Sequence, residues 1–237
     1  MLSDSIFRHV GGDCPKVKGD RSPIDKDILV PTTSKHPPIT AKKIVIPGAD
    51  CPRLFAEAAR LEQFYTFDRV ICHVGTNYSD VCSRQETTFE IQRFLSAIQD
   101  LFDCDVSYSP ILPKISRDEQ ENRKRPLSAH TKSIIEAICE INAHVYSFCD
   151  DMSIDFLTCD AFIMDPCFPQ PRRSLFAYDG THLFRQGVVE MEHCLFDHLT
   201  TLFWLHIDSY FSIYCANSLN LGKQKQMCTC FCEPLYD

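Results

Sequence analysis

The chain of 237 residues lacks a long, uninterrupted apolar run. Its longest apolar stretch, residues 199–215, carries His206 and Asp208, and these polar groups make it a poor candidate for a helix that crosses a bilayer. The segment Met1–Ser5 does not show the basic region followed by an apolar run that marks a secretory signal. We therefore expect a cytoplasmic protein without a transmembrane segment.

The sequence also has fewer positively than negatively charged residues. The sequence has 24 Lys and Arg against 32 Asp and Glu, which gives a net charge of −8. Direct nucleic-acid binding needs clustered positive charge, so this balance argues against it. The basic run Asn122–Pro126 follows Asp118, Glu119 and Glu121, and its charge is nearly cancelled, as expected of a solvated loop. The hydrophobic fraction of 44% is typical of a globular protein and excludes disorder of the whole chain.

Cysteine is abundant, with 14 residues, in a chain that shows no export signal. We expect most of the thiols to be free. Four cysteines in apolar contexts are expected to be buried, namely Cys72, Cys139, Cys149 and Cys194. The tail segment Cys228–Cys232 lacks the spacing that suits a tetrahedral zinc site, so no metal is expected there.

Short apolar runs alternate with segments of helical periodicity. Strands are predicted at residues 44–46, 69–74, 106–112 and 154–157, and helices at 54–65, 87–102, 131–148 and 182–203. This alternation predicts an α/β fold with a parallel sheet that is covered on both faces.

Two regions fall outside this pattern. Residues 11–41 are rich in Pro, Gly, Asp and Lys and are expected to form a long irregular loop. The C-terminal segment has no clear periodicity. We therefore expect one domain over residues 1–203 and a poorly structured extension over 204–237.

Polar residues and glycines follow the predicted strands. Gly48 follows the run at 44–46, Gly75 and Asn77 follow the run at 69–74, and Asp179 and His182 precede the last helix. In open parallel sheets, ligands bind beyond the carboxyl ends of the strands. We therefore expect these residues to meet at one edge of the sheet.

The residue types suit acyl transfer. Ser5, at the start of a predicted helix, could act as a nucleophile with His182 as its base, and Asp179 could bond the far ring nitrogen of His182. The backbone N–H groups of Ser5 and Gly48 and the Asn77 amide could form an oxyanion hole.

Each residue also has a plainer use. Ser5, Asn77 and Asp179 could cap helices or turns, and Gly48 and Gly75 could simply allow tight turns. The order of the segments along the chain favours the catalytic interpretation.

Four segments resemble, in order, the conserved blocks of the SGNH (GDSL-type) hydrolases. Leu2–Ser5 is similar to the GDS block, with Ser3 in place of its glycine, and Ile46–Ala49 is similar to the glycine block. His73–Asn77 resembles the GxN block. Asp179–Leu183, followed by Gly187, resembles the DGxHL block.

The resemblance implies a three-layer α/β/α sandwich around a parallel, flavodoxin-like sheet. It also implies a serine esterase that acts on a small-molecule or lipid-like ester without a metal or cofactor. In that fold the first strand pairs between two others, and only Met1–Ser3 would remain of it here, a truncated first strand.

The chain is most similar to esterase-like domains in the first open reading frames of some LINE-type retrotransposons. The alternative is therefore a catalytically impaired domain of this fold that serves in interactions and derives from a mobile-element protein.

Overall fold

The computed structural model describes residues 2–3, 24–30, 39–46, 48–158, 170–195 and 197–199. The chain divides into two compact units, Met1–Asp197 and His198–Asp237. The predicted extension at 204–237 lies outside the described residues.

Six strands form one sheet in the order β2-β3-β1-β4-β5-β6. Their bounds are β1 Leu2–Ser3, β2 Ile24–Val30, β3 Ile39–Val45, β4 Arg69–His73, β5 Asp105–Tyr108 and β6 Asp155–Phe156. Neighbouring strands are parallel from β3 to β6, whereas β2 is antiparallel to β3. The predicted α/β class with an open, parallel sheet is therefore confirmed.

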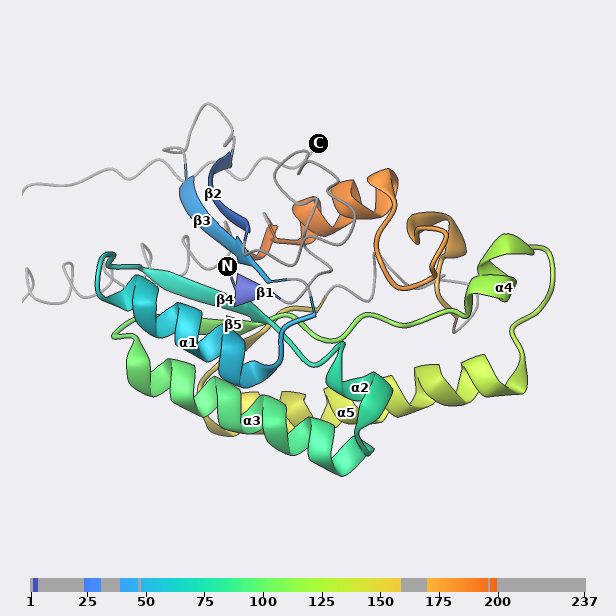
Figure 1. Ribbon diagram of the computed structural model, residues 1–237, viewed down its shortest axis with the longest axis horizontal. Helices are drawn as coiled ribbons and strands as arrows, with labels where there is room; N and C mark the ends of the chain where they lie inside the picture. The colour runs from blue at the N-terminus through green and yellow to red at the C-terminus, as the bar shows by residue number, and fades with distance from the viewer. Residues whose placement is uncertain are drawn as a thin grey trace, which may run out of the picture. The chain divides into compact units, whose positions relative to one another are not determined.

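Strand β1 lies between β3 and β4 (Figure 1). Leu2 pairs with Ile44 on one side and Cys72 on the other, and Ser3 pairs in the same way with Val45 and His73. The first strand thus has the position between two others that the resemblance implies, and it spans two residues.

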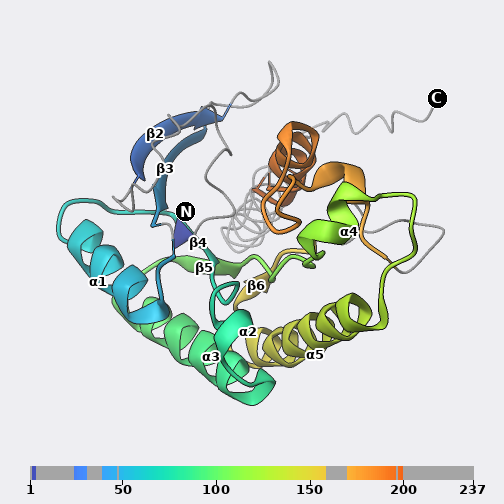
Figure 2. The same ribbon diagram turned by 45° about the vertical axis from the view of Figure 1, so that its right-hand side comes forward.

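The prediction of an irregular loop over residues 11–41 is wrong where the structure describes them. Ile24–Val30 and Ile39–Val45 form an antiparallel ribbon, and Figure 2 shows β2 and β3 curving together. Both strands contain charged residues, as in Asp25–Asp27 and Lys42–Lys43, which lower their apolar signal. Of the two, β2 is an edge strand, and charges on edge strands discourage pairing with other chains. The rest of that range, 11–23 and 31–38, lies outside the described residues.

The structure confirms the helices predicted at 54–65, 87–102 and 131–148, and it adds two short helices that were not predicted. They are α1 Cys51–Glu62, α2 Tyr78–Val81, α3 Arg84–Leu101, α4 Arg117–Glu121 and α5 Ala129–Asp151, with a 3-10 turn, η2, at Arg173–Leu175. Residues 185–195 are also helical. Side-chain caps begin the three long helices: Asp50 for α1, Ser83 for α3 and Ser128 for α5 each accept a hydrogen bond from a backbone N–H in the first turn.

Helices α1, α3 and α5 pack on one face of the sheet. Val70, Cys72 and Tyr108 from the strands are buried there against Leu54 of α1 and Leu95 of α3. In both views the helix at residues 185–195 lies on the other side of the sheet from α3 and α5 (Figure 1, Figure 2). The sheet therefore has helices on both sides.

The cysteine prediction holds only in part. Cys72 and Cys149 are buried free thiols, and burial raises the pKa of each to about 12. Cys139 is exposed, contrary to expectation, because it follows the buried Ile138 on α5 and therefore points away from the core. Cys194 is buried as expected, but it is disulfide-bonded and not free.

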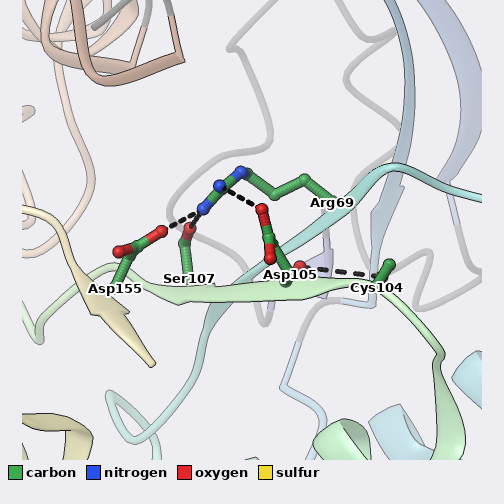
Figure 3. A network of polar contacts seen from close by, with 5 residues as sticks. All are labelled: Arg69, Cys104, Asp105, Ser107 and Asp155. Carbon is green, nitrogen blue, oxygen red and sulfur yellow. Dashed lines mark hydrogen bonds and ion pairs between the residues drawn. The ribbon is translucent and has the colours of Figure 1, made fainter. Parts of the chain in front are cut away.

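An arginine joins three strands at their amino ends. Arg69 Nη1 donates to Ser107 Oγ at 2.8 Å and to Asp155 Oδ2, while Nη2 donates to Asp105 Oδ2 at 2.7 Å. Figure 3 shows the guanidinium between these side chains, with Cys104 donating to the Asp105 carbonyl nearby. This network ties β4, β5 and β6 together at the edge opposite their carboxyl ends.

The turn after β4 requires glycine. Gly75 has a φ of 106°, and a Cβ there would lie 2.6 Å from Ile91 Cδ1 and 2.9 Å from Ile111 Cδ1. Gly48 also has a positive φ, 69°, but nothing lies within 4 Å of the position of its Cβ. Alanine at position 48 would therefore meet backbone strain alone, whereas alanine at position 75 would meet both backbone strain and steric conflict.

We predict that Gly75→Ala lowers the free energy of unfolding by about 2 to 4 kcal/mol, because strain and overpacking act together. The matched variant Gly48→Ala should cost about 1 kcal/mol, the strain alone. Urea unfolding of both variants measures the difference. Equal losses would show that the contacts of Gly75 with Ile91 and Ile111 impose no constraint.

Candidate active site

The turn after β4 is linked to the turn after β3. Asn77 Nδ2 donates to the Ala49 carbonyl at 3.0 Å, and the Cys51 N–H donates to the Tyr78 hydroxyl at 3.4 Å. Ala49 directly follows Gly48, and Gly48 is exposed. The structure thus brings Gly48 and Asn77, two candidate oxyanion-hole residues, to neighbouring turns at the carboxyl edge of the sheet.

Lys114 also binds the turn that carries Asn77. Its Nζ donates to the Thr76 carbonyl at 2.6 Å, to Ser79 Oγ at 3.0 Å and to Asp80 Oδ1 at 2.5 Å. The lysine is 7% exposed, so its ammonium is removed from bulk water and compensated by these three acceptors. In the sequence, Lys114 ends the run Ile111–Lys114, which resembles a strand end common in SGNH hydrolases, but the pattern assigns this lysine no role.

Asp179 and His182 are in direct contact. His182 Nδ1 lies 2.6 Å from Asp179 Oδ2, and Asp179 Oδ1 accepts the backbone N–H groups of Thr181 at 3.0 Å and His182 at 2.9 Å. The hydrogen bond with the His182 ring is the main cause that holds the pKa of Asp179 well below its usual range, and the two backbone donors add to it. The carboxylate is therefore ionised at neutral pH and orients the imidazole through Nδ1.

The loop that carries this pair is pinned to Ile115. The Ile115 N–H donates to the Gly180 carbonyl at 3.0 Å, and a Cβ on Gly180 would lie 2.0 Å from the Ile115 carbonyl oxygen. On its other side, the Ala177 N–H donates to the His182 carbonyl at 2.7 Å. Ile115 follows Lys114 in the chain, so adjacent residues hold the Asn77 turn and the Asp179–His182 loop.

The candidate site residues are thus present as two pairs, Gly48 with Asn77 and Asp179 with His182. Ser5, the candidate nucleophile, lies outside the described residues, and its place relative to these pairs stays a prediction.

A separate groove of about 880 Å³ lies between α3 and α5. Its lining includes Arg84, Phe89, Glu140 and His144 and none of the candidate site residues. Within the described ranges, no cluster of three or more His, Cys, Asp or Glu side chains could hold a metal ion. None of the described helices is both long enough and apolar enough to cross a membrane.

No protein-family model matches the sequence, and no curated protein matches it either. Solved structures do match. A GDSL-like lipase from Bacteroides thetaiotaomicron superposes with a TM-score of 0.53 at 15% identity, over 67% of this chain and 74% of that one. A carbohydrate acetylesterase from Sinorhizobium meliloti superposes with a TM-score of 0.50 at 14% identity, over 67% of this chain and 76% of that one.

At such identities the likeness defines the fold. The parallel sheet with helices on both sides is the three-layer, flavodoxin-like fold of the GDSL (SGNH) esterases and lipases. A shared fold does not by itself determine an activity.

We predict that the contribution of Asp179 to stability depends on pH. Since its pKa is lowered in the folded chain, that contribution is present above the unfolded value of about 4 and is lost as the pH falls below it. Asp179→Asn keeps an oxygen for the two backbone donors but loses the charge. Urea unfolding should show a larger deficit of Asp179→Asn at pH 6 than at pH 3. A deficit that is the same at both pH values would contradict the charged pair.

Proposed function

We propose that the chain is a serine esterase that hydrolyses a carboxylic ester, acyl or acetyl. Ser5 is the nucleophile, His182 the general base and Asp179 the residue that orients it. The Ser5 and Gly48 N–H groups and the Asn77 amide stabilise the oxyanion. The observation that carries the proposal is the 2.6 Å contact between His182 Nδ1 and Asp179 Oδ2 on a fold that hosts ester hydrolases.

The proposed reaction proceeds through an acyl-enzyme. His182 Nε2 takes the hydroxyl proton as Ser5 Oγ attacks the ester carbonyl, and it returns the proton to the leaving alcohol. Water, activated by the same nitrogen, then releases the acid. Because Asp179 is ionised, it stabilises the imidazolium that forms at each step. The proposed chemistry uses no metal or cofactor.

Chain length supports Ser5 in this role. Ser5 follows Ser3 of β1 by two residues, so the two Cα atoms are at most about 7 Å apart. Ser3 pairs with Val45 and His73, and the chain runs on from those residues to Gly48 and Asn77. Since β1 is parallel to both β3 and β4, the carboxyl ends of the three strands lie at the same edge of the sheet.

The Asn77 amide can serve two acceptors. One of its two hydrogens is donated to the Ala49 carbonyl, and this bond fixes the plane of the amide. The second hydrogen is available to an oxyanion. The turn glycine, Gly48, is exposed and carries no Cβ, so a substrate can approach its backbone closely.

The substrate class is a small-molecule or lipid-like ester. An acetyl ester is the first choice for an assay, because one of the similar solved structures is a carbohydrate acetylesterase. The ester p-nitrophenyl acetate is uncharged and has a good leaving group, so its hydrolysis needs little binding of the alcohol part. It therefore tests the reacting groups themselves.

We predict that the protein cleaves p-nitrophenyl acetate and that a fluorophosphonate probe labels Ser5. Ser5→Ala and His182→Ala should each lower kcat/KM by about a thousandfold or more. His193→Ala is the matched control, since His193 is exposed on the helix at residues 185–195, and it should retain the wild-type rate. A wild-type rate that survives in Ser5→Ala would exclude this serine esterase.

A second candidate is an interaction domain of this fold that has lost its activity, derived from a mobile-element protein related to LINE-type first open reading frames. The observation that favours it is that, among the described residues, β1 is paired with its neighbours through Leu2 and Ser3 alone before the chain reaches Ser5. The same assay separates the two candidates, because the interaction domain should show neither probe labelling nor a rate that depends on His182.

A further inference from the structure

We infer that Lys114 is a positioning residue for the oxyanion hole, acting through the turn that carries Asn77. This inference rests on the proposed esterase function. It assigns a role to a buried cation that the triad and the oxyanion donors do not use.

The contacts of Lys114 use all three of its hydrogen-bond donors. An ammonium has three hydrogens, and Nζ has three acceptors at 2.5 to 3.0 Å: the Thr76 carbonyl, Ser79 Oγ and Asp80 Oδ1. All three belong to the stretch that surrounds Asn77. The lysine comes from the segment after β5, so these bonds fix the turn after β4 to the neighbouring strand connection.

Thr76 is held at a second point. Its Oγ1 lies 3.4 Å from His73 Nε2, and His73 Nδ1 lies 3.3 Å from Ser109 Oγ. His73, Thr76 and Ser109 are all buried. The residue directly before Asn77 is therefore anchored by its carbonyl to Lys114 and by its hydroxyl to β4, and this leaves Asn77 little freedom to move.

The adjacent residues Lys114 and Ile115 set the distance between the Asn77 turn and the loop that carries the base, His182. While Lys114 holds the Asn77 turn, the Ile115 N–H holds the Gly180 carbonyl between Asp179 and His182. A change in the Lys114 bonds would shift the oxyanion donors relative to the base. Reaction rates fall by about a hundredfold for a displacement of about 1 Å in such groups.

The expected effect is on kcat. The oxyanion forms only in the transition state, so a displaced Asn77 lowers kcat and leaves ground-state binding nearly unchanged. We predict that Lys114→Met lowers kcat for p-nitrophenyl acetate by about tenfold to a hundredfold and changes KM by less than about twofold. Lys132→Met, at an exposed lysine on α5, is the matched control and should keep the wild-type kcat.

A double-mutant cycle with Asn77→Ala distinguishes positioning from general damage. If Lys114 acts through Asn77, the Lys114→Met loss disappears once the amide is gone, and the double variant has the kcat of Asn77→Ala alone. Losses that multiply would overturn the inference, as would a wild-type kcat in Lys114→Met.

Two further variants cover the case in which Lys114→Met does not fold. Lys114→Arg keeps the charge, and Asp80→Asn changes the acceptor that is 60% exposed at its side chain. Each should lower kcat by about twofold to tenfold, because each disturbs the turn but keeps a cation at position 114. As with Lys114→Met, the loss should appear only while Asn77 is present. Wild-type kcat in both would overturn the inference.

The His182→Ala variant separates this inference from the proposed function. If wild-type hydrolysis does not depend on His182, the esterase proposal fails and the role of Lys114 fails with it. If hydrolysis depends on His182 but not on Lys114, only the positioning inference fails.

Discussion

The Lys114–Ile115 segment is the connection on which the geometry of the candidate site depends. The Lys114 ammonium holds the Thr76 carbonyl at 2.6 Å, and the N–H of the next residue holds the Gly180 carbonyl at 3.0 Å. The first bond fixes the turn with Asn77 and the second fixes the loop with Asp179 and His182. Segments about a hundred residues apart in sequence thereby share one rigid support, which is what preorganised catalysis needs.

The charges of the sheet are divided between its two edges. At the amino ends, Arg69 bridges Asp105 and Asp155 and ties three strands together. At the carboxyl ends, the buried Lys114 is compensated by the exposed Asp80, while Asp179 is kept ionised by the His182 ring and two backbone donors. At the carboxyl ends, an ionised carboxylate thus lies beside an imidazole, which is the arrangement that general-base chemistry requires.

The sequence predicted the elements whose signal is local. The buried strand β4 and the helices α3 and α5 follow from their apolar patterns, and the Asp179–His182 contact follows from a spacing of three residues around a turn glycine. Strand β2 was missed because charged side chains interrupt its apolar residues, and its partner β3 was predicted only at residues 44–46. The role of Lys114 could not be predicted, since its acceptors lie 34 to 38 residues away and meet it only in the folded chain. The exposure of Cys139 and the disulfide at Cys194 likewise depend on packing that the sequence pattern does not reveal.

The most direct measurement is a crystal structure of the protein after reaction with a small fluorophosphonate, whose tetrahedral phosphorus imitates the intermediate of ester hydrolysis. We predict that phosphorus is bonded to Ser5 Oγ. We also predict that the phosphonyl oxygen lies about 2.7 to 3.1 Å from the Gly48 nitrogen and from Asn77 Nδ2, with His182 Nε2 facing Ser5 Oγ. Phosphorus on any other residue, or a phosphonyl oxygen directed away from Asn77, would contradict it.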